Sequence, residues 1–301
     1  MIFYNGANGS LGRYFAEAAV QAKRPAYALR SRIEDRAGFL DEVANHIGDS
    51  KSASLFLLAA KVSVPWCESH PAETHQTNVV DTEALARSFL EFCGSRRVDS
   101  RLIYVSSAHL YARHEGKIHE TDPVGPRSVY ARSKWEAEKA LGKLAERFEA
   151  DLRIPRVFGL VAPMQPVYYI LPALLKRARE LALAGVPGLS NLRDYLDARD
   201  VCRSLLAVES VDAEAYRRVC PDQTLNIASG EGRTIRSILE LCLALMHGQE
   251  NLSKYAALIT EAPARADDVP RIVASLDRYL SLMGHSPRTI PLDQTIRDAL
   301  A

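Results

Sequence analysis

Three glycines spaced three residues apart follow the first short apolar segment of the chain. Gly6, Gly9 and Gly12 lie in the segment N-G-A-N-G-S-L-G, directly after an apolar run at residues 2–4 and at the start of a helical pattern. Such glycines permit a tight turn, let the backbone approach a diphosphate and allow the helix to pack against the strand. The helix N-terminus then presents free N–H groups and the positive end of its dipole. The pattern predicts a nucleotide-binding turn, although a glycine triplet alone indicates only a turn and a helix start.

Strand-like and helical segments alternate through the first half of the chain. The apolar runs with strand character lie at residues 2–4, 26–29, 55–60, 102–105 and 152–158. Helical patterns cover residues 82–92 and 130–148, and a later helix is expected from Val201 to about Glu209, with Asp200 as its N-cap. This alternation is typical of a parallel sheet with helices on both faces. We therefore expect an α/β fold with a doubly wound parallel (Rossmann) sheet.

The second half of the chain is less regular and richer in proline than the first. We expect residues 1–159 to form the dinucleotide-binding Rossmann domain, which the chain rejoins at about residues 194–230. The remaining segments, 160–193 and 231–301, are expected to form a smaller C-terminal substrate-binding lobe on the sheet.

Charge and composition exclude several classes of protein. Thirty-eight basic and 37 acidic residues leave a net charge of +1, whereas proteins that bind nucleic acid or membrane surfaces depend on excess positive charge. The apolar runs are shorter than the ~18 residues that span a bilayer, and the first residues carry no export leader. The five scattered cysteines are interpreted as reduced thiols, and the histidines do not form a metal-binding set. We expect a cytoplasmic protein that binds no metal and has no nucleic-acid or membrane partner.

Two arginines follow the second predicted strand. Arg30, Ser31 and Arg32 come directly after residues 26–29, at the position that reads the 2′ group of the adenosine ribose in a Rossmann fold. An acidic residue there accepts from the hydroxyl of NAD, whereas arginine neutralises the phosphate of NADP. The sequence therefore favours NADP (NADPH), with NAD as the alternative, unless these arginines form only a solvated strand end.

A serine, a tyrosine and a lysine are candidates for catalysis. Tyr130 and Lys134 are four residues apart on a predicted helix and so share one face, and Ser107 follows the buried strand at 102–105. The carboxyl ends of parallel strands meet at the cofactor crevice. A nearby ammonium and an oxidised nicotinamide would lower the pKa of a tyrosine from its usual value near 10. We expect Tyr130 to exchange a proton with a substrate oxygen, Ser107 to hydrogen-bond that oxygen and Lys134 to hold the ribose hydroxyls.

Together these motifs resemble the extended short-chain dehydrogenase/reductase family, also called the NAD-dependent epimerase/dehydratase family of nucleotide-sugar enzymes. The resemblance covers essentially the whole chain. The matching segments are G-A-N-G-S-L-G at 6–12, L-L-A-A at 57–60, T-N-V-V-D-T at 77–82, V-S-S-A-H-L-Y-A at 105–112, H-E-T-D-P-V-G-P-R-S-V-Y-A-R-S-K at 119–134, L-R-I-P-R-V-F-G at 152–159, R-D-Y-L-D-A-R-D-V at 193–201 and L-N-I-A-S-G-E-G at 225–232. The resemblance implies an NAD(P) cofactor, a nucleotide-diphosphate sugar as substrate, and a homodimer formed through the helices near 82–92 and 130–148.

The resemblance and the arguments above together give two sets of site residues. The expected cofactor-binding residues are Gly6, Asn8, Gly9, Ser10, Leu11, Gly12, Arg30, Ser31, Arg32, Ala59, Ala60, Lys61, Asn78, Tyr130, Lys134, Pro155 and Val157. The expected substrate-binding residues are Ser107, His109, Arg156, Arg193 and Arg265. The resemblance implies that Arg193 and Arg265 approach the substrate diphosphate, for which a guanidinium is a two-pronged partner. The alternative for each is a surface ion pair, and Arg156 departs from the asparagine that the family often has.

Three functions fit this pattern. The preferred one is the NADPH-dependent reduction of a keto group on a nucleotide-diphosphate sugar. The expected sugar is a 4-keto-6-deoxyhexose. The alternative is a 4-epimerase that oxidises and re-reduces one carbon on a captive NAD. The third is a non-catalytic NADP-binding regulator, against which the joint presence of Ser107, Tyr130 and Lys134 argues. Ala108 and His109 stand where dehydratases of the family have Asp-Glu, so dehydration is not expected.

Overall fold

The computed structural model describes residues 1–263 and 269–301, and its first half alternates between strands and helices. In chain order, the elements up to the end of the helix that carries Tyr130 and Lys134 are β1 (Ile2–Tyr4), α1 (Gly12–Gln21), β2 (Ala26–Ala28), α2 (Arg36–Ile47), β3 (Ser52–Leu57), α3 (Val64–Ser69), α4 (Pro71–His75), the π-helical η1 (Gln76–Asp81), α5 (Thr82–Ser95), β4 (Asp99–Tyr104), β5 (Ser106–Ser107), the 3₁₀ turn η2 (Ala108–Leu110) and α6 (Val129–Phe148).

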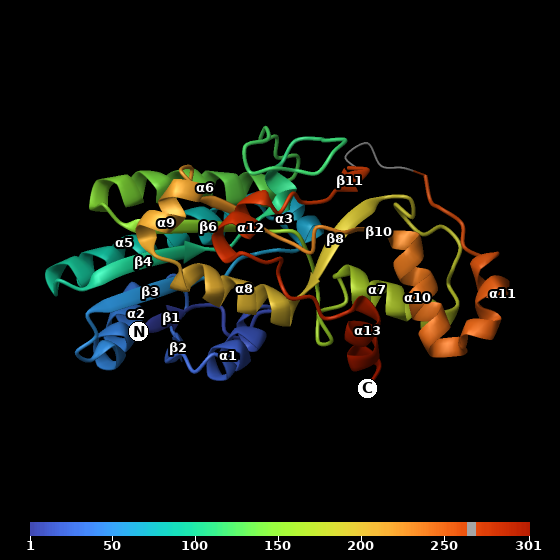
Figure 1. The fold of residues 1–301 in the computed structure, drawn as a ribbon, viewed down its shortest axis with the longest axis horizontal. Helices are drawn as coiled ribbons and strands as arrows, with labels where there is room; N and C mark the ends of the chain where they lie inside the picture. Colours follow the sequence, from blue (N-terminus) through green and yellow to red (C-terminus); the bar gives the residue numbers. More distant parts are fainter. Residues whose placement is uncertain (264–268) are drawn as a thin grey trace.

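The second half contributes the rest of the larger sheet and all of a smaller one. Its elements are β6 (Asp151–Val157), β7 (Gly159–Val161), α7 (Ile170–Glu180), β8 (Leu192–Asp197), α8 (Ala198–Ser210), α9 (Ala213–Val219), β9 (Thr224–Ile227), β10 (Gly232–Thr234), α10 (Ile235–His247), the 3₁₀ turn η3 (Gln249–Asn251), α11 (Leu252–Ala256), β11 (Arg271–Ile272), α12 (Asp277–Met283) and α13 (Leu292–Leu300). Figure 1 shows the larger sheet on the left and the lobe, with α7, α10, α11 and α13, on the right.

The larger sheet is doubly wound, as predicted. Within the described residues it has seven strands in the order β2-β1-β3-β4-β6-β5, with β9 paired to β6, and the pairings along it are parallel. Strand β1 pairs with β2 on one side and β3 on the other, so the direction of winding reverses beside β1. Ligands of open α/β sheets bind outside the carboxyl ends of the strands at this reversal point.

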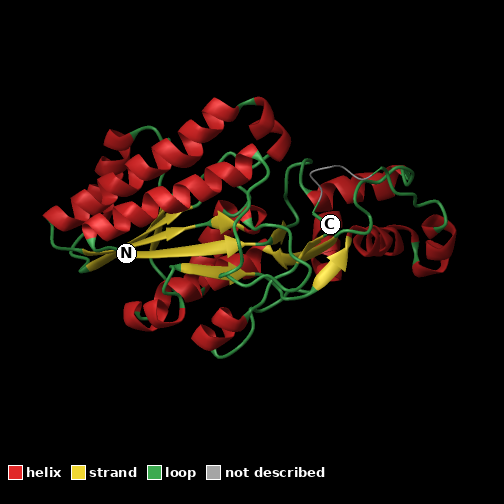
Figure 2. Ribbon diagram, turned by 90° about the horizontal axis from the view of Figure 1, so that it is seen from above, coloured by secondary structure: helices red, strands yellow, loops and turns green. Residues whose placement is uncertain are grey.

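Helices cover both faces of the larger sheet (Figure 2). Helices α2, α5 and α6 bury Phe39, Phe89 and Leu141 with one set of strand side chains. Helices α1 and α8 bury Phe15 and Leu205 on the opposite face, where α9 and α12 also pack. Each fully buried side chain of this size contributes roughly 1.5–3 kcal/mol of transfer free energy. This two-sided burial explains why the central strands are apolar runs rather than alternating ones.

The lobe has a sheet of its own, which the sequence did not predict. Strand β8 pairs in parallel with β7 and β11 and in antiparallel with β10. Helices α7 and α10 pack together beside it, with α13 completing their apolar core. The chain returns to the larger sheet with α8 at Ala198 rather than near residue 194, since β8 belongs to the smaller sheet.

The expectation that Asp200 caps a helix is wrong. Helix α8 begins three residues earlier, because Asp197 is its N-cap and accepts a hydrogen bond from the backbone of Arg199 at 2.8 Å. Asp200 lies inside the helix, where it accepts from the backbone N–H of Ile290 and pairs with Arg203. Asp197 therefore stabilises the start of α8, and Asp200 joins α8 to the segment at Ile290.

Other features of the structure bear on the compartment and partners. No helix in residues 1–263 and 269–301 is long and apolar enough to cross a membrane. The five cysteines are buried and unpaired with one another. Across the same residues, no group of three His, Cys, Asp or Glu side chains is arranged to hold a metal ion.

Candidate active site

The glycine turn connects β1 to α1 at the carboxyl edge of the larger sheet. Gly6 has φ +72°, and a methyl group there would lie 2.8 Å from the backbone nitrogen of Ala59. A methyl group at Gly12 would overlap the carbonyl oxygen of Gly6. Helix α1 has no side-chain cap at Leu11 and no acidic residue in its first turn. The turn therefore leaves the close approach and the free N–H groups that a dinucleotide diphosphate requires.

Two asparagines hold the neighbouring loop, which follows β3. Asn5, which the sequence analysis did not single out, accepts from the N–H groups of Leu58 (2.7 Å) and Ala59 (2.9 Å). Asn78 in η1 accepts from the N–H of Lys61 at 2.7 Å and donates to the Lys61 carbonyl and to the Ser133 hydroxyl. Asn78 therefore connects this loop to α6, one residue before Lys134, and supports the site.

Strand β5 and helix α6 bring the three candidate catalytic residues together. Ser128 caps α6 by accepting from the N–H of Ala131 at 3.0 Å, so Tyr130 lies in the first turn of the helix. A side-chain hydrogen bond joins Tyr130 to Ser107, which is only 6% exposed. Lys134 is 4% exposed, and its Nζ lies 4.2 Å from the ring centroid of Tyr104. The structure therefore places Ser107 next to Tyr130, with Lys134 one helical turn farther along α6.

Burial has the largest effect on the pKa values of Tyr130 and Lys134. It raises the pKa of Tyr130 to about 12, and the hydrogen bond with Ser107 acts in the opposite direction. Burial lowers the pKa of Lys134 to about 7, and the carboxylate of Glu138 partly offsets this effect. In the protein by itself, Tyr130 is thus a protonated phenol throughout the neutral range, whereas Lys134 changes charge within it.

His109 and Arg193 border the same group. The backbone N–H of His109 donates to the Ser107 hydroxyl at 3.2 Å, and its ring meets Tyr130 edge-on with centroids 6.1 Å apart. Desolvation by the surrounding protein lowers the pKa of His109 to about 4, and Arg193 acts in the same direction. Arg193, on β8, is near enough to affect His109, so the lobe contributes a cation close to the candidate catalytic residues. His109 is uncharged at neutral pH, so its imidazole can contact a ligand through hydrogen bonds.

Arg156 lies elsewhere than the sequence analysis expected. Its guanidinium is 3% exposed and is held by Glu138, the Tyr111 hydroxyl and the carbonyl of Glu120. These partners hold the guanidinium inside the protein, which argues against the predicted contact between Arg156 and a substrate. Pro155 and Val157 flank it inside β6, and Arg265 lies outside the described residues.

The end of β2 carries an acidic group that the sequence analysis missed. Glu42, from the second turn of α2, accepts from the backbone N–H groups of Arg30 (2.9 Å) and Ser31 (2.7 Å). Burial raises the pKa of Glu42, but these bonds and those from the side chains of Ser31 and Tyr27 lower it overall. The side chains of Arg30 and Arg32 are exposed, and Arg32 pairs with Glu34 at 2.8 Å. The strand end that is predicted to face the 2′ group of a dinucleotide thus carries both positively and negatively charged side chains.

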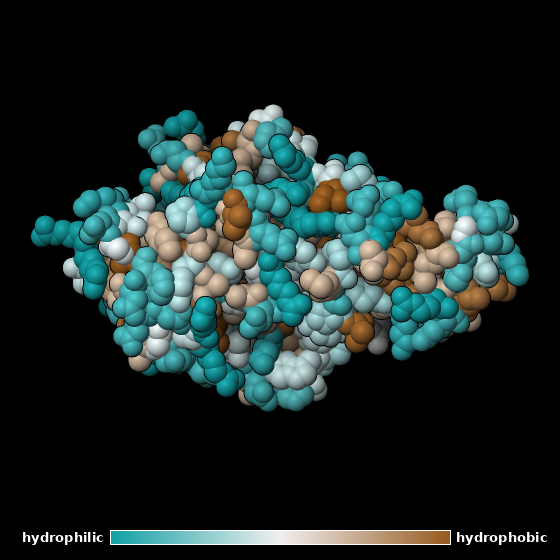
Figure 3. Space-filling view, turned by 90° about the horizontal axis from the view of Figure 1, so that it is seen from below, coloured by the Kyte–Doolittle hydropathy of each residue, from teal (hydrophilic) through white to brown (hydrophobic). Residues whose placement is uncertain are grey.

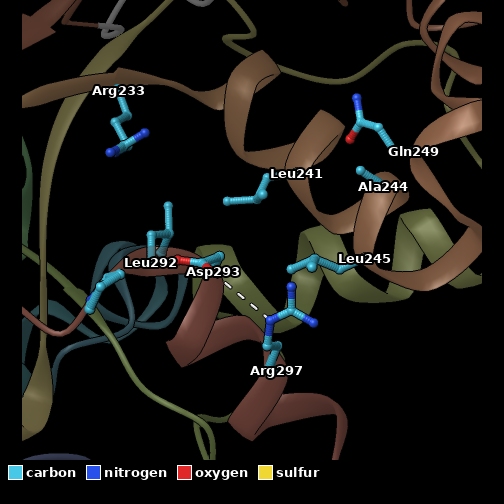
Figure 4. Close-up of a pocket in the computed structure, with 9 residues that line it drawn as sticks. Arg233, Leu241, Ala244, Leu245, Gln249, Leu292, Asp293 and Arg297 are labelled. Carbon is cyan, nitrogen blue, oxygen red and sulfur yellow. Dashed lines mark ion pairs between the residues drawn. The ribbon is translucent and has the colours of Figure 1, made fainter.

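A separate hollow of about 580 Å³ lies in the lobe between α10 and α13. Figure 4 shows its leucine side chains facing the gap, with Arg233 at one end and the Asp293–Arg297 pair at the other. Hydrophobic side chains also gather on this end of the molecule in the surface view of Figure 3. Of the predicted site residues that the structure describes, none lines this hollow.

Comparisons with known proteins show similarity in sequence and in fold. The model of the NAD dependent epimerase/dehydratase family matches residues 3–228. A UDP-glucose 4-epimerase of Halalkalibacterium halodurans is 20% identical over 329 residues, which cover 99% of this chain and 94% of that protein. A dTDP-4-dehydrorhamnose reductase of Mycobacterium tuberculosis is 32% identical over 144 residues, or 45% of this chain and 43% of that protein. The solved structure of RMD from Pseudomonas aeruginosa complexed with NADPH has the same fold, with a TM-score of 0.78, 23% identity and coverage of 99% of this chain and 97% of that one.

Proposed function

Because the chain belongs to the NAD-dependent epimerase/dehydratase family, we propose that it is an NAD(P)-dependent oxidoreductase acting on a nucleotide-diphosphate sugar. The reaction we propose is the NADPH-dependent reduction of a 4-keto sugar. The observation that carries this proposal is the protonated Tyr130 phenol, hydrogen-bonded to Ser107 and one helical turn from Lys134. A phenol that keeps its proton at neutral pH is suited to donate it to a carbonyl oxygen, which is what reduction requires.

The residues of the chain have distinct tasks in this reaction. When bound, NADPH supplies the hydride for the carbonyl carbon. Ser107 hydrogen-bonds the carbonyl oxygen and keeps it in line with Tyr130, which donates its proton to that oxygen as the carbon–oxygen double bond becomes single. Lys134 stabilises the phenolate that remains and holds ribose hydroxyls. The product is an alcohol with one more hydride and one more proton than the substrate.

Two side chains beside the triad are proposed as substrate contacts. Arg193 carries a permanent positive charge next to His109, and a guanidinium suits the diphosphate of a nucleotide sugar. His109 stays neutral because its pKa is about 4, so it offers a ring hydrogen bond to a sugar hydroxyl without a change in charge. Arg265 remains a proposal from the sequence.

NADP is the proposed cofactor, with NAD as the alternative. The exposed guanidinium of Arg30 at the end of β2 supports NADP, since it can neutralise a 2′-phosphate. Glu42 supports the alternative only in part, because two backbone N–H groups already share its negative charge.

A 4-epimerase is the second candidate. The similarity to a UDP-glucose 4-epimerase over 99% of this chain favours it. An epimerase must first remove the proton of a sugar hydroxyl, so Tyr130 would have to act as a base. With a pKa of about 12 in the protein alone, the phenol would need the positive charge of oxidised nicotinamide nearby to do so.

We also propose a cytoplasmic location and a homodimer formed through α5 and α6. The buried, unpaired cysteines suit a reducing compartment, and fractionation of native cells tests that location. The outer faces of α5 and α6 carry both signs of charge, including Glu83, Arg87, Glu136 and Lys139. Such a face can pair with itself across a two-fold axis. Sedimentation of the wild type and of Lys139→Glu tests the dimer, since a monomeric wild type contradicts it.

A cofactor-retention and turnover experiment tests the proposed function. A reductase loses its nicotinamide on gel filtration and oxidises added NADPH with a 4-keto nucleotide sugar, whereas an epimerase retains NAD. Tyr130→Phe should lower turnover by about 10²–10⁴-fold, the usual effect of losing an acid–base group, while Tyr168→Phe should not. NADPH binding without turnover across a panel of keto sugars would instead indicate a regulator.

A further inference from the structure

The segment after β7 connects the lobe to the cofactor turn. Its first part is held in shape by Gln165, which accepts from the N–H of Ala162 at 3.1 Å and donates to the Leu160 carbonyl at 3.2 Å. A turn follows, closed by the hydrogen bond from the N–H of Tyr169 to the Pro166 carbonyl at 3.0 Å. Helix α7 begins directly after Tyr169. The segment is therefore a defined strap with Tyr169 at its end.

Two hydrogen bonds fasten this strap to the other side of the site. The backbone N–H of Met164 donates to the hydroxyl of Tyr14 in α1 at 3.3 Å. The phenol of Tyr169 shares a side-chain hydrogen bond with Ser10, which lies in the glycine turn. The lobe thus contacts the turn that is expected to hold a diphosphate.

Tyr169 also lies close to the catalytic tyrosine. Its phenol is near enough to Tyr130 to affect the ionisation of that residue. The ring of Tyr169 is supported by Tyr168, with centroids 5.1 Å apart, while Tyr168 itself is 56% exposed. Tyr169 therefore lies between the glycine turn and Tyr130. A dinucleotide that binds the turn with its diphosphate and reaches Tyr130 with its nicotinamide must extend through this region.

Ser10 and Tyr169 both carry hydroxyl groups that can donate to phosphate oxygens. A diphosphate offers acceptors only, so either hydroxyl can exchange the other for a phosphate partner. Burial raises the pKa of Tyr169, although the bond with Ser10 opposes this, so the phenol keeps its proton at neutral pH.

We propose that Tyr169 is a cofactor-binding residue supplied by the lobe, whose hydroxyl exchanges its hydrogen bond with Ser10 for one to the dinucleotide diphosphate. This inference rests on the proposed function, since it needs a dinucleotide on the glycine turn. Its consequence is that cofactor affinity depends on the position of the lobe. Removal of the Tyr169 hydroxyl then weakens cofactor binding even though Tyr169 is remote in sequence from the turn.

Equilibrium binding without any sugar tests this inference. The dissociation constants of NADPH and NADH are measured by calorimetry for the wild type, Tyr169→Phe and the matched control Tyr168→Phe, with each fold checked by circular dichroism. Tyr169→Phe should weaken binding about 10- to 100-fold, as for a hydrogen bond to a charged group, and Tyr168→Phe less than about twofold. ADP-ribose, which carries the diphosphate without nicotinamide, should lose the same factor, whereas AMP should not.

The opposite results overturn the inference in distinguishable ways. Equal or tighter NADPH binding by Tyr169→Phe means that Tyr169 only competes with the cofactor for Ser10. In that case the inference about Tyr169 fails, but the proposed function is unaffected. A wild type that binds neither dinucleotide at millimolar concentration overturns the proposed function, and the inference fails with it. If Tyr169→Phe does not fold, Ser10→Ala replaces it: in that variant Tyr169 remains available to the diphosphate, so a loss of binding larger than about 100-fold contradicts the exchange.

Discussion

Arg156 and Glu138 form a buried, two-pronged ion pair between β6 and α6. The Arg156 Nε lies 3.1 Å from Oε1 of Glu138, and Nη2 lies 2.7 Å from Oε2. The two residues are 3% and 4% exposed. Glu138 is one helical turn beyond Lys134, whose pKa it raises against the effect of burial. This pair therefore connects the packing of α6 to the electrostatics of the candidate catalytic residues.

Loss of one partner of this pair should destabilise the fold. Arg156→Ala leaves the Glu138 carboxylate buried without its counter-charge, which costs about 3–5 kcal/mol. Urea unfolding measures this loss, and the double variant Arg156→Met/Glu138→Met should recover at least half of it, because neither charge is then left alone. If Arg156→Ala instead kept full stability and raised only the KM for the sugar nucleotide, Arg156 would be a substrate contact after all.

The buried ammonium of Lys134 should make stability depend on pH. Its pKa is about 7 in the folded protein and near 10.4 in the unfolded chain. Between these values the unfolded chain binds one more proton at this site, so the site favours folding increasingly as the pH rises. The stability of the wild type minus that of Lys134→Met should therefore increase by about 1.4 kcal/mol per pH unit from pH 7.5 to 9.5 without cofactor. A difference that stays flat over this range would mean that Lys134 keeps its usual pKa.

Arg30 and Glu42 should set the cofactor preference in opposite directions. Arg30→Ala removes the cation that faces a 2′-phosphate, so the ratio of NADPH to NADH affinity should fall by about tenfold, or ~1.4 kcal/mol. Glu42→Gln removes a negative charge at the same strand end and should raise that ratio. Titrations with both dinucleotides measure the ratios, with Arg36→Ala, an exposed arginine at the start of α2, as the control. An unchanged ratio in Arg30→Ala would exclude Arg30 from the 2′ site.

Two glycine-to-alanine changes should have different effects, one on dinucleotide binding and the other on stability. A methyl group at Gly12 overlaps the Gly6 carbonyl, so Gly12→Ala must displace the turn and should abolish dinucleotide binding. A methyl group at Gly142, on α6, has nothing within 4 Å. Gly142→Ala should therefore stabilise the protein by about 0.5–1 kcal/mol through helix propensity, with binding unchanged. Thermal unfolding and dinucleotide titration test both changes, and normal binding by Gly12→Ala would place the diphosphate elsewhere.

Much of the fold and part of the site followed from local sequence. The glycine turn was predictable because close backbone approaches permit few residues besides glycine, and the strand–helix alternation because a sheet buried on both faces requires apolar runs. The pairing of Tyr130 with Lys134 was predictable because a helix places residues four apart on one face. Each of these signals spans only a few neighbouring residues.

The partners of charged and hydroxyl groups were decided by the tertiary structure alone. The sequence could not show that Arg156 would be neutralised by Glu138, that Glu42 would reach the end of β2, or that Tyr169 would meet Ser10 across the site. It also missed the smaller sheet, whose strands are short and come from distant segments. By itself, the sequence determined the parallel sheet and predicted a dinucleotide-binding turn and a candidate catalytic triad. Long-range packing decides which charged side chains are buried and which remain available to a ligand. Burying a charge costs several kcal/mol, and this cost is offset only where the fold brings a distant partner within hydrogen-bond range.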